Sequence, residues 1–342
     1  MSDASKIPVT VLTGYLGAGK TTLLNRILSE DHGKKYAVIV NEFGEIGIDN
    51  DLIVGADEEV FEMNNGCICC TVRGDLVRII SGLMRRKGKF DAIIVETTGL
   101  ADPAPVAQTF FVDEDVQKNA RLDAVVTVAD AKWLSDRLKD APEAKNQIAF
   151  TDVIVLNKTD LVTKPELAEV EARIRAINPY ARLHRTERCQ IAISDVLERG
   201  AFDLDRILEI EPEFLNAGDD HDHHHDHDHE HGEHCDHPHH HHHDDDVKSF
   251  VFRSDKPFNP AKLEDFLGAI VQVYGPKMLR YKGVLNMKGT DKKVIFQGVH
   301  QMMGSDLGPK WMPGEKKQSK MVFIGIDLPK EVLMQGLEGC LA

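Results

Sequence analysis

The residues best suited to chemistry form a glycine-rich segment near the start of the chain, Gly14-Tyr-Leu-Gly-Ala-Gly-Lys20-Thr21. It fits the pattern G-x-x-x-x-G-K-[ST], in which backbone N–H groups and a helix N-terminus point at phosphate oxygens. In such loops the lysine reaches the β- and γ-phosphates and the hydroxyl binds Mg²⁺. The alternative is an ordinary glycine turn. The predicted nucleotide-binding residues here are Gly14, Gly17, Ala18, Gly19, Lys20, Thr21 and Thr22.

A second motif, Asn157-Lys-Thr-Asp160, follows the apolar run DVIVLN. The carboxylate of Asp160 can accept two hydrogen bonds from the N1–H and 2-amino groups of guanine. Adenine lacks that donor pair and would leave the carboxylate unpaired. We expect Asn157 to contact the base edge and the stem of Lys158 to pack on its face. The motif therefore favours GTP over ATP.

A third motif, Glu96-Thr-Thr-Gly99, ends the run DAIIVE. A carboxylate there can hold Mg²⁺ through water, and the glycine lets a backbone N–H approach the γ-phosphate; a simple strand-to-loop turn is the alternative. We predict that Lys20, Thr21, Glu96 and Gly99 serve hydrolysis and that Thr21 and Glu96 serve Mg²⁺. Residues 41–45 (NEFGE) also follow a strand and are predicted to form a switch loop.

A cysteine cluster, Cys67-Ile-Cys69-Cys70, precedes a predicted helix. In an extended segment Cys67 and Cys69 project to the same side, and Cys70 lies near the helix N-terminus, where the dipole favours thiolate. Two or three thiolates suit Zn²⁺, Cu⁺ or iron, and an incomplete ligand set suits a site that must release its metal. Glu42 is a hypothetical additional ligand. Buried small hydrophobes and a redox pair remain alternatives.

A histidine tract with interspersed acids holds fourteen of the 17 histidines. Neutral imidazoles bind divalent metals, and so many equivalent ligands predict several weakly held ions. A solvated acidic spacer or an affinity tag is the alternative, although a tag belongs at a terminus. The predicted ligands of the tract are His221, His223, His224, His225, His227, His229, His231, His234, Cys235, His237, His239, His240, His241, His242 and His243.

Short apolar runs between helical patterns are expected to position the first set of motifs. The runs at 7–13, 36–41, 91–96, 123–129 and 152–157 alternate with helical spacing at 20–30 and 72–86. This pattern predicts a doubly wound, mostly parallel α/β sheet for a GTPase domain over residues 1–212. Residues 213–247 cannot bury a core and are predicted to be a disordered linker. Residues 248–342 are predicted to form a small α+β domain, with strands at 249–253, 283–287, 293–297 and 321–327 and helices at 261–273 and 331–337.

Composition limits the classes of function. The net charge is −15, but residues 213–246 contribute twelve acidic and no basic side chains, so the remainder is close to neutral. No basic patch predicts nucleic-acid binding. No apolar run is long enough to span a membrane, and no signal peptide is recognisable. The near-contiguous cysteines do not fit a disulfide framework. We therefore expect a cytoplasmic protein that binds neither nucleic acid nor membrane.

The order of these motifs resembles the CobW-like metallochaperone GTPases, relatives of UreG and HypB. The segments GYLGAGKTTLLN, NEFGEIGID, GCICC, ETTGLADP and NKTD carry the resemblance, together with RYKG (280–283), FQGVH (296–300) and Trp311. It covers almost the whole chain. The resemblance implies a GTPase domain, a smaller C-terminal domain and a C-x-C-C metal site at Cys67, Cys69 and Cys70. It also implies zinc, cobalt or iron handling and, in some members, cobalamin synthesis.

The resulting hypothesis is a GTP-hydrolysing metallochaperone that uses GTP and Mg²⁺. It would bind Zn²⁺, or alternatively Co²⁺ or Fe²⁺, and transfer it to a client metalloprotein. A nucleotide- or metal-dependent homodimer is an expectation from analogy. The alternatives are metal storage with a structural GTP site, cobalt handling for cobalamin synthesis, a GTPase of translation or signalling, and ATP-dependent chemistry, which Asp160 disfavours.

Overall fold

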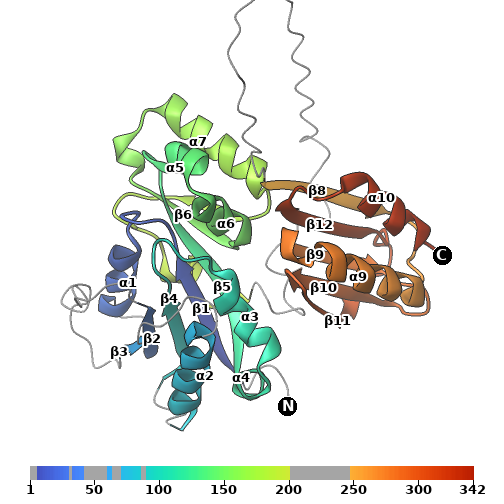
Figure 1. Ribbon diagram of the computed structural model, residues 1–342, viewed down its shortest axis with the longest axis horizontal. Coiled ribbons are helices and arrows are strands. Elements are labelled where there is room, and N and C mark those ends of the chain that lie inside the picture. The colour runs from blue at the N-terminus through green and yellow to red at the C-terminus, as the bar shows by residue number, and fades with distance from the viewer. Residues whose placement is uncertain (1–5, 31–32, 42–59, 64–70, 86–89, 201–246) are drawn as a thin grey trace, which may run out of the picture.

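The fold consists of two sheets that lie side by side. The computed structural model describes residues 6–30, 33–41, 60–63, 71–85, 90–200 and 247–342. Figure 1 shows the N-terminal sheet with its helices on the left and the C-terminal sheet, in orange and red, on the right. Among the described residues, no helix combines the length and the apolar character needed to cross a bilayer.

The N-terminal sheet is parallel throughout. Its strands are β1 (Ile7–Thr13), β2 (Tyr36–Asn41), β3 (Val60–Met63), β4 (Ala92–Glu96), β5 (Ala120–Asp130), β6 (Val153–Asn157) and β7 (Arg182–Arg185). Their order is β3-β2-β4-β1-β5-β6-β7, and each adjacent pair runs parallel. Parallel strands end at one edge of a sheet, so the segments that follow β1, β2, β4 and β6 all start from that edge.

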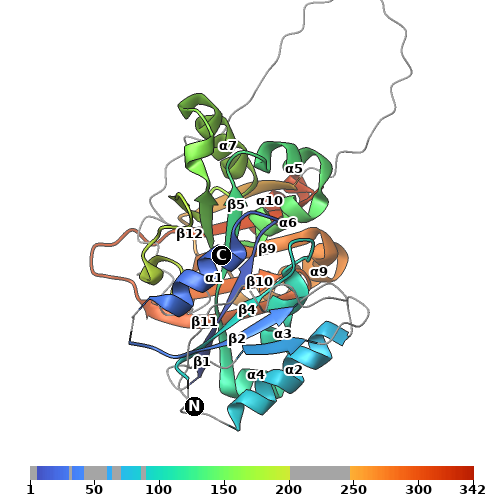
Figure 2. The ribbon, with the colours of Figure 1, turned by 90° about the vertical axis from the view of Figure 1, so that its left-hand side faces the viewer.

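Helices cover both faces of this sheet. They are α1 (Lys20–Ser29), α2 (Thr71–Met84), α3 (Ala104–Val112), α4 (Glu114–Asn119), α5 (Leu134–Asp140), α6 (Pro142–Phe150) and α7 (Lys164–Ile177). The helix α1 buries Leu23, Leu24 and Ile27 against one face, whereas α2 to α7 pack on the other. Figure 2 shows α1 and α2 on opposite sides of the strands. Burial on both faces explains why the strands read as continuous apolar runs.

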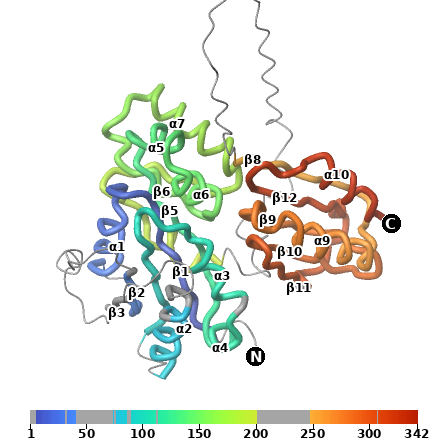
Figure 3. The backbone as a smooth tube through the Cα atoms, viewed as in Figure 1, coloured from blue at the N-terminus to red at the C-terminus, as the bar shows by residue number. Residues whose placement is uncertain are grey.

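The C-terminal sheet is antiparallel. Its elements are β8 (Val247–Ser254), α9 (Pro260–Tyr274), β9 (Met278–Asn286), β10 (Lys292–Val299), β11 (Met302–Lys310), β12 (Ser319–Ile326) and α10 (Lys330–Gly339), with strand order β11-β10-β9-β12-β8. The helices α9 and α10 cover one face with an aromatic core that includes Tyr281 and Phe323. The opposite face packs against the first domain, which lies beside it in Figure 3.

The expected fold class is confirmed, and several boundaries are corrected. The predicted start of β9 at residue 283 is wrong, because the strand begins at Met278. The strands β3, β7 and β11 are absent from the elements that the sequence predicts. The strand β11, MMGSDLGPK, has neither an apolar run nor clear alternation, and it is held by backbone pairing with β10. Strand β8 begins at Val247, one residue before the predicted domain start.

Candidate functional site

The glycine-rich loop connects β1 to α1, as the motif requires. Lys20 is the first residue of α1, and its Nζ donates to the carbonyl oxygens of Gly14 at 2.8 Å and Tyr15 at 3.4 Å. The N-terminus of α1 carries no side-chain cap, an arrangement that suits its first N–H groups to binding an anion. A Cβ on Gly19, whose φ is +118°, would lie 2.7 Å from the Asn157 side chain. A close backbone approach therefore requires glycine at this position.

Asn157 ties this loop to the neighbouring strand end. It is 2% exposed at the end of β6. Its Nδ2 donates to the carbonyl of Ala18 at 3.0 Å, and its Oδ1 accepts from the N–H of Cys189 at 2.8 Å and the hydroxyl of Thr186 at 3.3 Å. The sequence suggested a base contact for this side chain. In the structure its amide links the loop to residues 186–189, and the base contact stays a prediction.

Lys158 fixes the same loop from the other side. Its backbone is left-handed, with φ of 62°, and its Nζ donates to the carbonyl of Gly17 at 2.7 Å and to the Asp130 carboxylate at 2.6 Å. Asp160 lies in a short helical turn (Thr159–Leu161) and is exposed. Among the described residues, nothing hydrogen-bonds or pairs with its carboxylate, which leaves both oxygens available to the donors of a purine base.

Cys189 packs against the glycine-rich loop at Gly19. The side chain is fully buried, and its Sγ lies 3.4 Å from the carbonyl oxygen of Gly19. Burial raises the pKa of this thiol to about 11, so it is protonated at neutral pH. In the sequence Cys189 stands alone and is expected only to pack or to lie at the surface. No local motif indicates its contact with the loop.

The Glu96-Thr-Thr-Gly99 segment lies on the opposite flank of the loop. Glu96 is the last residue of β4 and is 7% exposed, and Thr21 lies in the first turn of α1. Gly99 approaches the loop so closely that a Cβ would lie 2.6 Å from the backbone nitrogen of Leu16. The backbones of the segment and the loop are therefore packed directly against each other.

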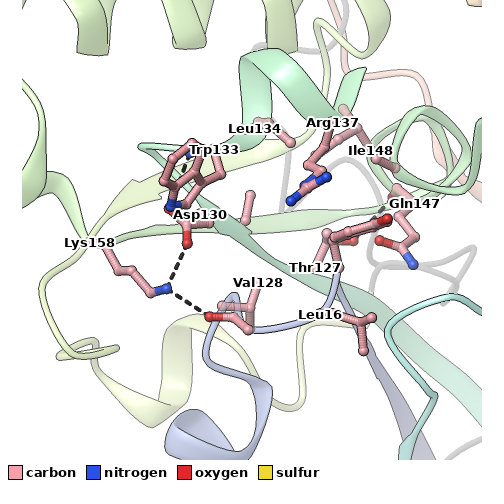
Figure 4. Close-up of a pocket in the computed structure, with 14 residues that line it drawn as sticks. Leu16, Thr127, Val128, Asp130, Trp133, Leu134, Arg137, Gln147, Ile148 and Lys158 are labelled. Carbon is pink, nitrogen blue, oxygen red and sulfur yellow. Dashed lines mark hydrogen bonds and ion pairs between the residues drawn. The ribbon is translucent and has the colours of Figure 1, made fainter. Parts of the chain in front are cut away.

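A cavity of about 290 Å³ runs along the β5 side of the loop. Leu16 lies on one side of it, and Trp133 and Arg137 lie on the other (Figure 4); Tyr15 also lines it. The Arg137 guanidinium stacks 5.3 Å from the centre of the Tyr15 ring. The lining of the cavity is mostly apolar, whereas the N-terminus of α1 presents backbone N–H groups.

The predicted metal ligands lie outside the described residues. This holds for Glu42, Cys67, Cys69 and Cys70, and for the tract from His221 to His243. The described elements nevertheless include the residues that flank Glu42 and the three cysteines in the sequence. Strands β2 and β3 are parallel neighbours in which Asn41 pairs with Met63, and α2 starts at Thr71. Within the residues that the structure describes, no group of three or more metal-binding side chains occurs.

Comparison with known proteins places the chain in a family. The CobW/HypB/UreG nucleotide-binding domain matches residues 8–185, and the cobalamin synthesis protein cobW C-terminal domain matches residues 247–341. The chain is 33% identical to the zinc chaperone YjiA of Escherichia coli, over 97% of this chain and 98% of that protein. It is 32% identical to the zinc-regulated GTPase metalloprotein activator 1 of Schizosaccharomyces pombe, over 98% and 83%, respectively.

A solved structure supports the same assignment. The crystal structure of zinc-bound YjiA GTPase from E. coli superposes with a TM-score of 0.74 at 27% identity, covering 98% of this chain and 99% of that chain. The likeness therefore extends over both domains and not over the P-loop fold alone. The chain belongs to the CobW family, with a CobW/HypB/UreG nucleotide-binding domain followed by a CobW C-terminal domain.

Proposed function

We propose that this chain is a GTP-hydrolysing metallochaperone that binds zinc and passes it to a client metalloprotein in a nucleotide-dependent way. The main support for nucleotide binding is the pair of hydrogen bonds that Asn157 and Lys158 donate to the carbonyls of Ala18 and Gly17. These bonds hold the phosphate loop and the base-recognition segment in one arrangement. Relatives that match over nearly the whole chain and are named zinc chaperones support the metal half.

The residues present fit a guanine nucleotide with Mg²⁺. The uncapped N-terminus of α1, the loop Gly14, Gly17, Ala18 and Gly19, and the side chains of Lys20, Thr21 and Thr22 would hold the phosphates. Asp160 would accept from the base, and Lys158 would pack on its face. Thr21 and Glu96 would hold Mg²⁺, which neutralises charge on the phosphates when bound. The N–H of Gly99 would meet the γ-phosphate.

Zinc would be the cargo of this protein and not a resident cofactor. We propose that Cys67, Cys69 and Cys70 hold it, with Glu42 as a further ligand and the tract His221–His243 as a collecting site for weakly bound ions. The register supports a shared site, because Asn41 and Met63 are paired at adjacent strand ends. Glu42 directly follows Asn41, and Cys67 lies four residues after Met63. At roughly 3.5 Å of chain per residue, this spacing allows Glu42 and Cys67 to meet at one metal ion. Cobalt or iron in place of zinc is a competing outcome.

We further propose a cytoplasmic protein with a GTPase domain over residues 1–212, a metal-binding linker over 213–247 and a C-terminal domain over 248–342. A homodimer that depends on nucleotide or metal belongs to the same proposal. The switch would lie at residues 41–45 and at Gly99, because both segments start at the strand edge that faces the phosphates.

The test is a zinc titration against a chromophoric chelator. It compares the full chain with a triple variant (C67S, C69S and C70S), each with Mg²⁺ plus either GDP or a non-hydrolysable GTP analogue. We expect a tight site, present only in the unmodified chain, whose affinity differs by about tenfold or more between the nucleotides. Equal affinities would favour storage without nucleotide gating. Loss of the difference in E42Q would support Glu42 as a ligand.

A further inference from the structure

The helix α6 contacts residues 99–102, which follow the proposed γ-phosphate contact at Gly99, through a buried side chain. Gln147 is 1% exposed, and its Nε2 donates to the carbonyl oxygens of both Gly99 and Ala101 at 3.1 Å. Its backbone carbonyl accepts from the hydroxyl of Thr127 at 3.1 Å, which fixes the helix on β5. The neighbouring Asn146 reaches the Asp102 carboxylate at 3.4 Å. Residues 99–102 are therefore held from α6.

The last residue of the same helix, Phe150, is bound by the C-terminal domain. Arg280 of β9 donates through Nη1 to the carbonyl of Phe150 at 2.8 Å, and its Nη2 pairs with the Asp152 carboxylate. Both partners of this ion pair are about 95% or more buried. Asp152 also accepts from the N–H of Val125 at 2.9 Å, so Arg280 is anchored to the sheet as well as to the helix.

These two contacts are three residues apart on one nine-residue helix. Gln147 and Phe150 are separated by less than one turn, a distance over which a hydrogen-bonded helix moves as a rigid body. Ala149, between them, is fully buried and belongs to the same apolar cluster as Leu279 and Val322 of the C-terminal sheet. The helix therefore forms a short structural link between the Gly99 carbonyl and the surface on which the C-terminal domain rests.

We propose that the C-terminal half of α6 couples the γ-phosphate to the C-terminal domain, with Gln147 and Arg280 as the positioning residues on its two sides. The inference rests on the proposed function, because it assumes that the Gly99 segment changes position between the GTP and GDP states. Gln147 carries that change into the helix, and Arg280 carries it from Phe150 into β9. The position of the C-terminal domain then depends on whether GTP or GDP is bound.

The chain contains a natural reporter for this change. Trp311 is one of two tryptophans, is 7% exposed, and belongs to the apolar cluster that includes Ala149 of α6. The Lys293 ammonium lies 4.9 Å from the centre of its ring, so its emission is sensitive to small displacements of a nearby charge. The other tryptophan, Trp133, is half exposed beside the cavity and is removed by W133F.

The experiment measures Trp311 emission in full-length W133F with Mg²⁺ plus GDP or a non-hydrolysable GTP analogue, with nucleotide binding followed separately by calorimetry. We expect the two nucleotides to give different emission spectra. In Q147L the difference should fall to less than about a fifth, and R280K, which keeps the charge but loses the forked geometry, should reduce it independently. The matched control is K145Q on the same helix, which should keep the full difference because it leaves both the Gly99 and the Phe150 contacts in place.

The outcomes separate this inference from the proposed function. If both nucleotides bind but Trp311 emission is identical, or if Q147L and R280K both retain the full difference, the coupling role of α6 is wrong while GTP binding stands. If calorimetry detects no guanine nucleotide binding, the proposed function fails and the inference fails with it. Because R280K acts from the other domain, the proposal stays testable even if Q147L does not fold.

Discussion

The Asn157 carboxamide offers the sharpest test of how the nucleotide site is built. In N157A, three hydrogen bonds disappear together: those to the carbonyl of Ala18, the N–H of Cys189 and the hydroxyl of Thr186. The site is 2% exposed, so water cannot replace the lost partner without a rearrangement. The Thr186 hydroxyl keeps a second contact, to the Leu156 carbonyl at 3.4 Å, and should lose least.

The magnitude follows from two orphaned backbone groups. Leaving one buried polar group without its partner costs about 1–3 kcal/mol, so N157A should lower the free energy of unfolding by about 2–6 kcal/mol. That is a large fraction of the roughly 5–15 kcal/mol typical of a folded domain. Because the phosphate loop itself is released, the affinities for GTP and GDP should fall together, by roughly a hundredfold or more.

Two measurements on matched variants check this reasoning. Urea denaturation gives the loss of stability, and calorimetry gives the affinities for GTP, GDP and xanthosine nucleotides. The comparison variant is D160N, whose side chain is exposed and makes no contact among the described residues. It should leave stability unchanged and lower guanine affinity by about 10- to 100-fold, the value of a hydrogen bond to a charged acceptor.

The opposite pattern would refute the structural role. If N157A is as stable as the parent protein and loses affinity for guanine alone, its amide acts on the base and the observed ties are unimportant. If D160N destabilises the fold, the Asp160 carboxylate has a structural partner.

Three further predictions concern other parts of the molecule. In G99A the new methyl group would lie 2.6 Å from the backbone nitrogen of Leu16. GTP hydrolysis, measured by phosphate release, should therefore slow by about tenfold or more, while GDP affinity changes little. An unaltered rate would show that this close approach is irrelevant. The Cys189 thiol binds its proton more tightly in the folded chain than in the unfolded chain, so the free energy of unfolding should fall between pH 9 and about 11, by up to about 1.4 kcal/mol per pH unit. C189A should lack that component in denaturation curves, and equal pH dependence in both proteins would contradict the assignment. Deleting residues 219–246 should lower the number of weakly bound zinc ions, measured by equilibrium dialysis, while keeping the tight site; loss of the tight site would place it in the tract instead.

The sequence predicted the positions of the three nucleotide-binding motifs in the fold, because each motif consists of contiguous residues. The glycine-rich loop, the Asn157–Asp160 motif and the Glu96–Gly99 motif each combine a strand end with functional side chains, so pattern and position agree. The parallel sheet was predictable because strands buried on both faces are apolar throughout. The strand β11 was not, because backbone pairing with β10 rather than side-chain pattern holds it in place.

The connections between motifs could not be predicted. Asn157 and Ala18 are 139 residues apart, and Arg280 and Asp152 are 128 residues apart, so nothing local marks either pair. Gln147 looks like an ordinary polar residue of an amphipathic helix until the fold brings the Gly99 carbonyl to it. Positions of this kind are defined by what they touch, and only the folded chain shows the contacts.

The burial of strand β9 has a consequence for how this protein can be divided. All nine of its residues are buried, because α9 and α10 cover one face of the C-terminal sheet and the first domain covers the other. A fragment beginning at Val247 would expose Leu279, Val322 and Trp311 on a single flat surface, a liability for aggregation. Separating the chain at the predicted linker, residues 213–247, would therefore uncover this apolar surface. We therefore expect the C-terminal domain to depend on its contact with the first domain for stability.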